Sequence, residues 1–174
     1  MQHSTEPPTP SVRRQLSMFV PDGVEVDFEV FRRTLDPVQS LLIPAHVTLC
    51  REDELNQISE SELRRRLSQA PVKPITLHFG KPETFGGHGI LLNCIDRASD
   101  FHLLREHVLG SKTIIEQRPH ITLAHPKNSK SHGNSLANAL RLPEGISITF
   151  PAIQLIEQHG VQPWEMLQQF KLLR

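Results

Sequence analysis

The chain has 174 residues and a formal net charge of zero, with 19 basic and 19 acidic side chains. This length suits one domain, or two closely packed lobes. The balanced charge argues against a long surface for a polyanion, whose affinity would require many cationic contacts, but allows a small anionic ligand. The sequence has no apolar run of about 18 or more residues and no basic-then-apolar N-terminus, so it indicates neither a membrane span nor secretion.

The two cysteines, Cys50 and Cys94, do not have the spacing of metal ligands. Such a pair is typical of reduced thiols in a cytosolic protein. We therefore expect a cytoplasmic location. Nothing in the sequence indicates an obligatory protein partner, and we expect a monomer.

The predicted elements begin after a flexible tail over residues 1–13, whose first ten residues are polar and rich in proline. Residues 14–174 are expected to form a single domain. Turn signals and apolar periodicity divide it into strands and helices. In chain order these are a strand over 16–20, a helix over 24–35, a strand after Pro44, a helix over 59–69, a hairpin of 75–79 and 89–94, a helix over 98–109, a strand after Pro119, a helix over 131–140, and strands over 146–150, 152–158 and 166–172.

This order favours an α+β fold, because it lacks the strict strand–helix alternation of a doubly wound sheet. The helix over 98–109 is expected to be capped by Ser99 or Asp100 and to end at Gly110. The two halves of the chain share one pattern of a strand, a helix and a second strand, which indicates a weak internal duplication.

The second strand of each half carries the same motif, HVTL over residues 46–49 and HITL over residues 120–123. Side chains alternate along a strand, so the His and Thr of each motif share one face while the aliphatic residues point into the core. We therefore expect two imidazoles and two hydroxyls to face one cleft. By the same alternation, Cys50 is expected on this face, as a small buried residue rather than a nucleophile.

Two histidines across a cleft can perform acid and base catalysis together. A neutral imidazole takes a proton from an attacking water, and a protonated one gives a proton to the leaving oxygen. Each threonine hydroxyl can donate to a non-bridging phosphate oxygen. This chemistry needs no metal or cofactor. A zinc site built from His46, His120 and a third ligand is an alternative, although the chain has no His-Glu-x-x-His motif and no cysteine pair with metal spacing.

The two motifs and their flanking prolines resemble the paired signatures of the 2H phosphoesterase superfamily, which includes bacterial 2′-5′ RNA ligase-like proteins and cyclic nucleotide phosphodiesterases. The resemblance implies an α+β, bilobal, pseudo-two-fold fold with antiparallel sheets lining a central cleft and helices outside. It implies metal-independent phosphodiesterase activity on 2′,3′-cyclic phosphates or 2′-5′ bonds of small nucleotides or RNA ends. His46 and His120 would be the catalytic acid and base, and Thr48 and Thr122 would bind the phosphate.

Two further residues are candidates for substrate binding. Arg118 stands two positions before His120, so alternation places it on the same face, where it could bind phosphate. Members of this superfamily often stack an aromatic residue on the base, and the chain has no tyrosine. The resemblance therefore implies Phe19, Phe85 or Trp164 in this role, or else weak base recognition. We favour Phe85, which lies in a glycine-rich loop between two strands.

The sequence leaves a second function open, a non-catalytic module that holds RNA ends or nucleotides in the same cleft. It also leaves the acid and base roles of the two histidines unassigned, because pseudo-symmetry would let the substrate lie either way round. ATP-dependent ligation is disfavoured, since the chain has neither a glycine-rich phosphate loop nor a Lys-x-Asp-Gly-type motif.

Overall fold

Eight strands form one antiparallel sheet in the order β6-β3-β4-β5-β2-β1-β7-β8. The computed structural model describes residues 11–70, 73–110 and 116–172. The strands are β1 (Val12–Phe19), β2 (His46–Cys50), β3 (Ile75–Phe85), β4 (Gly89–Cys94), β5 (His120–Ala124), β6 (Ile146–Phe150), β7 (Ala152–His159) and β8 (Glu165–Lys171). The helices are α1 (Phe28–Leu35), α2 (Pro37–Leu42), α3 (Glu52–Leu55), α4 (Glu60–Ser68), α5 (Ser99–Leu109) and α6 (Leu136–Ala139).

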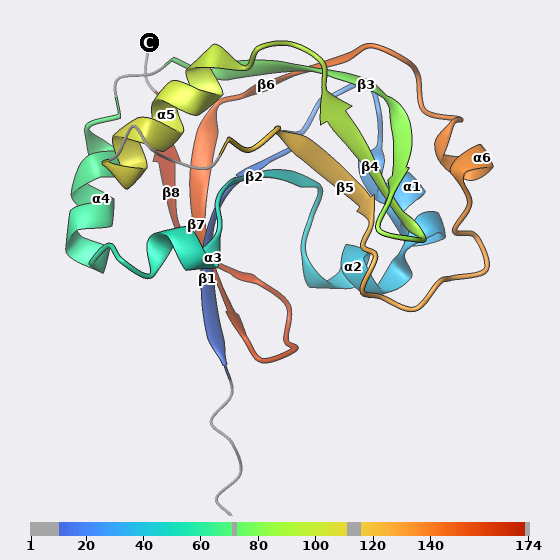
Figure 1. The fold of residues 1–174 in the computed structure, drawn as a ribbon, viewed down its shortest axis with the longest axis horizontal. Helices are drawn as coiled ribbons and strands as arrows, with labels where there is room; N and C mark the ends of the chain where they lie inside the picture. The colour runs from blue at the N-terminus through green and yellow to red at the C-terminus, as the bar shows by residue number, and fades with distance from the viewer. Residues whose placement is uncertain (1–10, 71–72, 111–115, 173–174) are drawn as a thin grey trace, which may run out of the picture.

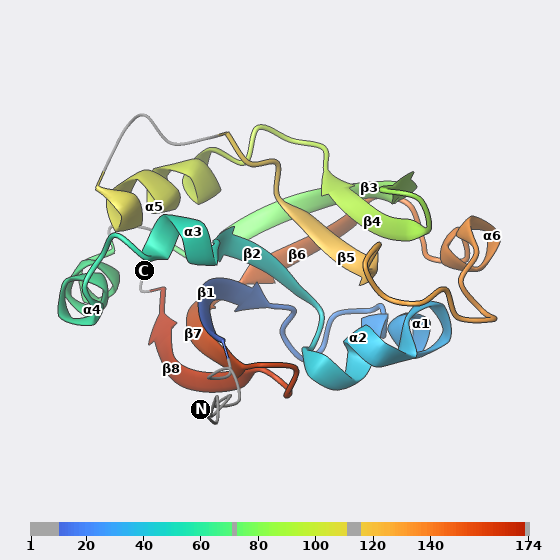
Figure 2. The same ribbon diagram turned by 60° about the horizontal axis from the view of Figure 1, so that its bottom comes forward.

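The sheet consists of two matching halves of four strands, which meet where β2 pairs with β5. These two strands lie side by side through the middle of the molecule (Figure 2). Helices α4 and α5 gather at one end, and α1, α2 and α6 gather at the other (Figure 1). The predicted α+β, pseudo-two-fold architecture is confirmed, with the strands of both lobes joined into one continuous sheet.

Alternation along the central strands separates the core from the opposite face of the sheet. Val47 and Leu49 of β2 and Ile121 and Leu123 of β5 are fully buried. The His and Thr of each motif are only partly buried. Period-2 patterning therefore fixes the direction in which each motif faces, because reversing it would expose four aliphatic side chains.

The first strand is longer than predicted and the helix after it is shorter. Strand β1 begins at Val12, which pairs with His159, so the sheet begins two residues before the predicted start of the domain at residue 14. Residues 1–10 of that tail lie outside the described residues. Helix α1 begins at Phe28 because the Asp27 carboxylate accepts from the backbone amides of Glu29 and Val30.

Three other predicted helix features need correction. The helix predicted over 131–140 is shortened to α6. Its first residues do not form a helix, because Ser131 donates to the carbonyl oxygen of Leu35 and this part of the chain lies against the C-terminal end of α1. Helix α5 has no side-chain cap, and its N-terminal cap position is Ala98 in the left-handed conformation, so a cap at Ser99 or Asp100 is wrong. Gly110 ends this helix at φ 66°, as predicted.

The short helices α2 and α3 were not predicted. Helix α2 begins at Pro37 and is capped by the Asp36 carboxylate, which accepts from the amide of Gln39. Helix α3 is a single turn directly after β2. In the described part of the chain, no helix has the length and apolarity that a membrane span requires.

Candidate functional site

The two His-x-Thr motifs lie next to each other at the centre of the sheet. Val47 and Ile121 are direct partners across the antiparallel β2–β5 pair. Each motif's histidine therefore lies opposite the other motif's threonine. The arrangement brings the four predicted residues together on one face, as alternation within each strand requires.

Both imidazoles are held by the same contact. His46 Nδ1 lies 2.8 Å from the carbonyl oxygen of Pro44, and His120 Nδ1 lies 3.0 Å from that of Arg118. A carbonyl oxygen only accepts, so Nδ1 of each ring carries the proton and donates it. The Nε2 atom of each ring is thereby left to exchange protons with a ligand.

Each motif ends in a bulge. The register with the neighbouring strand shifts after Thr48 in β2 and after Thr122 in β5. After each bulge, two consecutive residues point into the core. They are Leu49 and Cys50 in the first motif and Leu123 and Ala124 in the second. The prediction that Cys50 shares the face of His46 and Thr48 is therefore wrong, because the bulge interrupts the alternation.

The flanking strands add different neighbours to the two motifs. Across β1, Ser17 pairs with Thr48, and Phe19 pairs with His46. The Phe19 and His46 rings meet edge to face at 6.2 Å between centroids. Across β4, it is Asn93 that pairs with His120. The site is therefore pseudo-symmetric in its backbone and asymmetric in its surroundings.

A buried positive charge lies behind His46. Arg32 is 1% exposed, and its guanidinium donates to the Glu29 carboxylate and to the carbonyl oxygen of Ile43. The pKa of His46 is lowered to about 4, mainly by burial and to a smaller extent by the positive charges of Arg32 and His120, against the opposing effect of the Pro44 hydrogen bond. His46 is therefore neutral near pH 7.

A second buried arginine lies between the two motif segments. Arg105 of α5 is fully buried and donates to the carbonyl oxygen of Leu49, to Glu54 at 2.5 Å and to Gln117 Oε1 at 3.0 Å. Gln117 in turn donates to the carbonyl oxygen of Thr48 at 3.2 Å. The two segments that carry Thr48 and His120 are therefore tied together through one buried cation.

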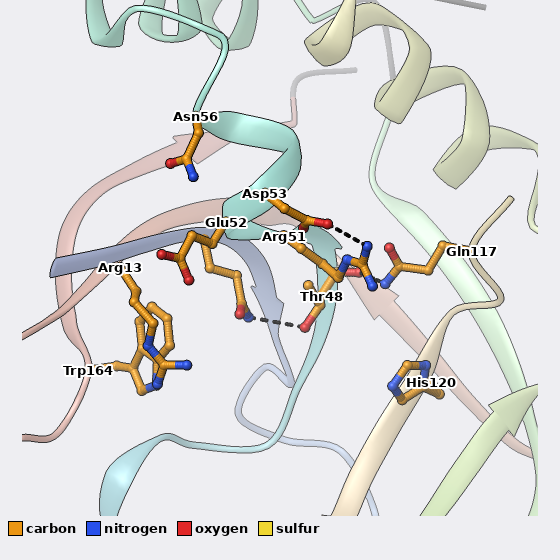
Figure 3. A pocket seen from close by; sticks show the side chains of 10 residues that line it. Arg13, Thr48, Arg51, Glu52, Asp53, Asn56, Gln117, His120 and Trp164 are labelled. Carbon is orange, nitrogen blue, oxygen red and sulfur yellow. Dashed lines mark hydrogen bonds and ion pairs between the residues drawn. The ribbon is translucent and has the colours of Figure 1, made fainter. Parts of the chain in front are cut away.

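An open pocket of about 550 Å³ lies beside this end of the site (Figure 3). Thr48 and His120 line it, and Thr48 Oγ1 accepts from Gln15 Nε2 at 3.0 Å. Trp164 and Arg13 lie at the far side, with the guanidinium carbon 5.3 Å from the ring centroid. The remaining lining residues are Arg51, Glu52, Asp53, Asn56 and Gln117.

Arg118 lies close to the site, in the segment before β5. Its Nε donates to the carbonyl oxygen of Cys94 at 2.8 Å. The side chain lines a second pocket of about 320 Å³, which also contains His120, Arg51 and Asn93. The structure therefore brings Arg118 next to His120, and its role as a phosphate ligand stays a prediction.

Phe85 lies at the end of β3, opposite Gly89 in the hairpin with β4. The cross-strand register places it on the face that carries Thr122, because Glu83 pairs with Leu91 and Leu91 pairs with Thr122. It does not line the pocket beside Thr48. The aromatic ring that does so is Trp164.

Comparison with known proteins agrees with this geometry. The sequence profile described as the 2′-5′ RNA ligase superfamily matches residues 20–162, which is most of the chain. The chain belongs to the 2′-5′ RNA ligase superfamily. The resemblance to 2H phosphoesterases is thereby confirmed at the level of family. A search of curated proteins gave no match.

Solved structures with the superfamily's fold are similar over nearly their whole length. A protein described as a phosphoesterase superposes with a TM-score of 0.58 at 14% identity, covering 94% of this chain and 100% of its own. LigT from E. coli complexed with 3′-AMP gives 0.54 at 14% identity, covering 93% and 98%. TT0787 of Thermus thermophilus gives 0.57 at 17% identity, covering 92% and 97%. At these identities the likeness shows the fold alone.

Other features of this superfamily member bear on its chemistry. Burial raises the pKa of the Cys50 thiol to about 12 and that of Cys94 to about 11, so neither is a thiolate near neutral pH. Among the described residues, no group of three His, Cys, Asp or Glu side chains is placed to hold a metal ion. The predicted metal-free mechanism stays a prediction, which chelation can test.

The sequence reasoning missed several residues that line the pocket. Gln15 shares the face of Ser17 by strand alternation, so period 2 could have identified it. Arg13 was assigned to the tail, and only its pairing with Gln158 places it in the sheet. Gln117 had no signal of its own, because its contacts run to Arg105 and to a backbone carbonyl oxygen.

Proposed function

We propose that this protein is a metal-independent phosphodiesterase that opens 2′,3′-cyclic phosphates or cleaves 2′-5′ phosphodiester bonds in nucleotides or at RNA ends. The observation that carries the proposal is the pairing of two His-x-Thr strands, with each imidazole held through Nδ1. Membership of the 2′-5′ RNA ligase superfamily supports it. The description of LigT as complexed with 3′-AMP supports a nucleoside phosphate as the class of ligand.

His46 is the base in this proposal. Its lowered pKa keeps the ring neutral, and its protonated Nδ1 leaves the Nε2 lone pair to accept a proton. A water held between Nε2 and phosphorus gives its proton to His46 as the new oxygen–phosphorus bond forms. Proton transfer of this kind contributes about 10²–10⁴-fold to the rate.

His120 is the acid. In the protonated ring, Nδ1 donates to the Arg118 carbonyl oxygen and Nε2 donates toward the substrate. As the bond from phosphorus to the ribose 2′ or 3′ oxygen breaks, His120 gives its proton to that oxygen. Thr48 and Thr122 donate to the two non-bridging oxygens, where negative charge accumulates in the transition state. Arg118, beside His120, would bind a phosphate oxygen of the same substrate.

The test is hydrolysis of the four 2′,3′-cyclic mononucleotides in EDTA, with wild type beside His46→Ala and His120→Ala. We expect turnover that survives chelation and is lost in both variants. His78→Ala is the matched control, because His78 is an exposed histidine on β3 outside the site. It should keep the wild-type rate.

The outcomes separate the alternatives. Loss of activity in EDTA would favour a metal site containing the same histidines. Tight nucleotide binding without turnover on cyclic mononucleotides or 2′-5′ dinucleotides would favour the binding module. Activity that persists in either histidine variant would refute the two-histidine mechanism.

A further inference from the structure

The two ends of the candidate site are chemically different. Because Val47 pairs with Ile121, Thr48 and His120 lie opposite each other at one end, while His46 and Thr122 lie opposite each other at the other. The pocket of about 550 Å³ opens beside the Thr48 and His120 end. A substrate with a large group on one side of its phosphate would therefore fit at the Thr48 and His120 end better than at the other end.

On the far side of this pocket, the Arg13 guanidinium stacks on the Trp164 ring, and the two side chains form one flat surface. Arg13 lies over the Trp164 ring at 5.3 Å, and the guanidinium donates to Gln158 Oε1. The Trp164 backbone amide donates to the carbonyl oxygen of Leu42 at 2.8 Å, so the ring is anchored at its backbone. The ring is only partly buried and lines the pocket together with Thr48 and His120.

The charges of the lining argue for an uncharged group in this pocket. The two arginines, Arg13 and Arg51, are matched by Glu52 and Asp53, and Arg51 pairs with Asp53 at 2.8 Å. A pocket for a second phosphate would carry an excess of cations. A heterocyclic base stacks on aromatic and guanidinium planes, and free carboxylate oxygens accept from its amino groups or from ribose hydroxyls.

We propose that this pocket is a nucleoside subsite, in which the base stacks on the Trp164–Arg13 surface. This inference rests on the proposed function and adds the direction in which the substrate lies. With the nucleoside beside Thr48 and His120, the ribose oxygen that leaves phosphorus lies near His120. The attacking water then lies at the opposite end, near His46. The subsite therefore agrees with the roles proposed above for His46 as base and His120 as acid, and it rests on a different observation.

The first test uses the fluorescence of Trp164, which is the only tryptophan in the chain. The full-length protein is titrated with each nucleoside 3′-monophosphate and, separately, with inorganic phosphate. We expect the nucleotides to change the emission of Trp164 with saturation, and phosphate to leave it unchanged. Nucleotides that inhibit turnover but do not change the emission would overturn the proposal.

The second test compares two substrates in the variant Trp164→Ala. We expect the KM for a cyclic mononucleotide to rise about 10- to 100-fold, because stacking on the ring is lost. The kcat should change little. Glycerol 1,2-cyclic phosphate has no base, so wild type and variant should hydrolyse it equally, which also shows that the variant is folded. Trp164→Phe should restore most of the affinity for the nucleotide.

Met166→Ala is the matched control, since Met166 is exposed on β8 close to Trp164 in the chain and does not line the pocket. It should behave as wild type on both substrates. Equal effects of Trp164→Ala on both substrates, or no effect on either, would overturn the subsite. Failure of the proposed function is distinguishable, because wild type would then hydrolyse neither substrate, and the fluorescence titration would still decide whether nucleotides bind beside Trp164.

Discussion

Replacing Arg32 by methionine tests whether this buried cation positions His46 and contributes to its lowered pKa, of which burial is the main cause. The guanidinium donates to both Glu29 oxygens at 2.9 Å and to the carbonyl oxygen of Ile43 at 2.7 Å. Glu29 also accepts from the amide of Ala45 at 2.6 Å. The pair therefore holds the backbone on both sides of the residue whose carbonyl oxygen orients His46.

The cost of the substitution follows from these contacts. The Ile43 carbonyl oxygen would lose a buried donor, which costs about 1–3 kcal/mol. The Glu29 side chain is 35% exposed, so losing its ion pair adds roughly 1 kcal/mol or less. Methionine removes the desolvation cost of Arg32, whose Nε has no hydrogen-bond partner among the described residues. We expect a net loss of about 2–3 kcal/mol, which corresponds to a fall in Tm of roughly 4–12 °C.

The same substitution should change the pH dependence of catalysis. Arg32 lowers the pKa of His46 through its charge, so removing the charge raises that pKa. The base is then protonated at a higher pH, so the acidic limb of the pH profile of kcat/KM shifts to higher pH. Thermal unfolding and a pH–rate profile on a cyclic nucleotide measure the two effects. Arg33→Met is the control, because Arg33 is exposed on the same helix. The reasoning is refuted if Arg32→Met costs no more stability than the control and leaves the acidic limb in place.

Three further predictions concern the site and the thiols. The folded-state pKa of His46 is depressed to about 4 from 6.5, so the unfolded chain binds more protons between these values. The free energy of unfolding should fall as pH drops through that window, and less so in His46→Ala, measured by urea denaturation. Thr48→Val and Thr122→Val should each lower kcat about 10²-fold, with Thr→Ser restoring much of it, because each removes one donor to the transition state. A steady-state assay that found KM changed alone would contradict this role. Cys50 and Cys94 should react with a thiol reagent only on unfolding, since burial raises both pKa values. Rapid labelling of the native protein would show that one of them is accessible.

The positions of the four motif residues could be predicted from the sequence because the information is local. Alternation along a strand places His46 and Thr48 on one side and the aliphatic residues on the other, and the same pattern recurs in the second motif. The bulge after each threonine could not be predicted, because an extra residue is defined only by the register with a neighbouring strand. The error in placing Cys50 follows directly from this.

The stacked pair in the pocket could not be predicted, because Arg13 and Trp164 lie near opposite ends of the chain. Arg13 reaches Trp164 only through the pairing of β1 with β7, the strand that precedes the Trp164 loop. No local pattern around either residue indicates that partner. Phe85 was favoured because of the glycines around it. These correctly predicted the turn between β3 and β4, but they carry no information on where the turn lies relative to the pocket beside Thr48.

The internal duplication extends further than the two motifs, into helix α1 on the N-terminal side of the first motif and helix α5 on the N-terminal side of the second. Phe28 and Arg32 of α1 have the same spacing as Phe101 and Arg105 of α5, and all four side chains are buried. The exposed fractions of Arg32 and Arg105 are 1% and 0%. Arg32 donates to the carbonyl oxygen of Ile43, just before β2, and Arg105 donates to that of Leu49, within β2. Both buried cations therefore hold the first motif strand, and Arg105 also connects it to Gln117 in the segment before β5. The differences between the two ends of the site arise from the residues that line the pocket beside Thr48 and His120, such as Arg13 and Trp164.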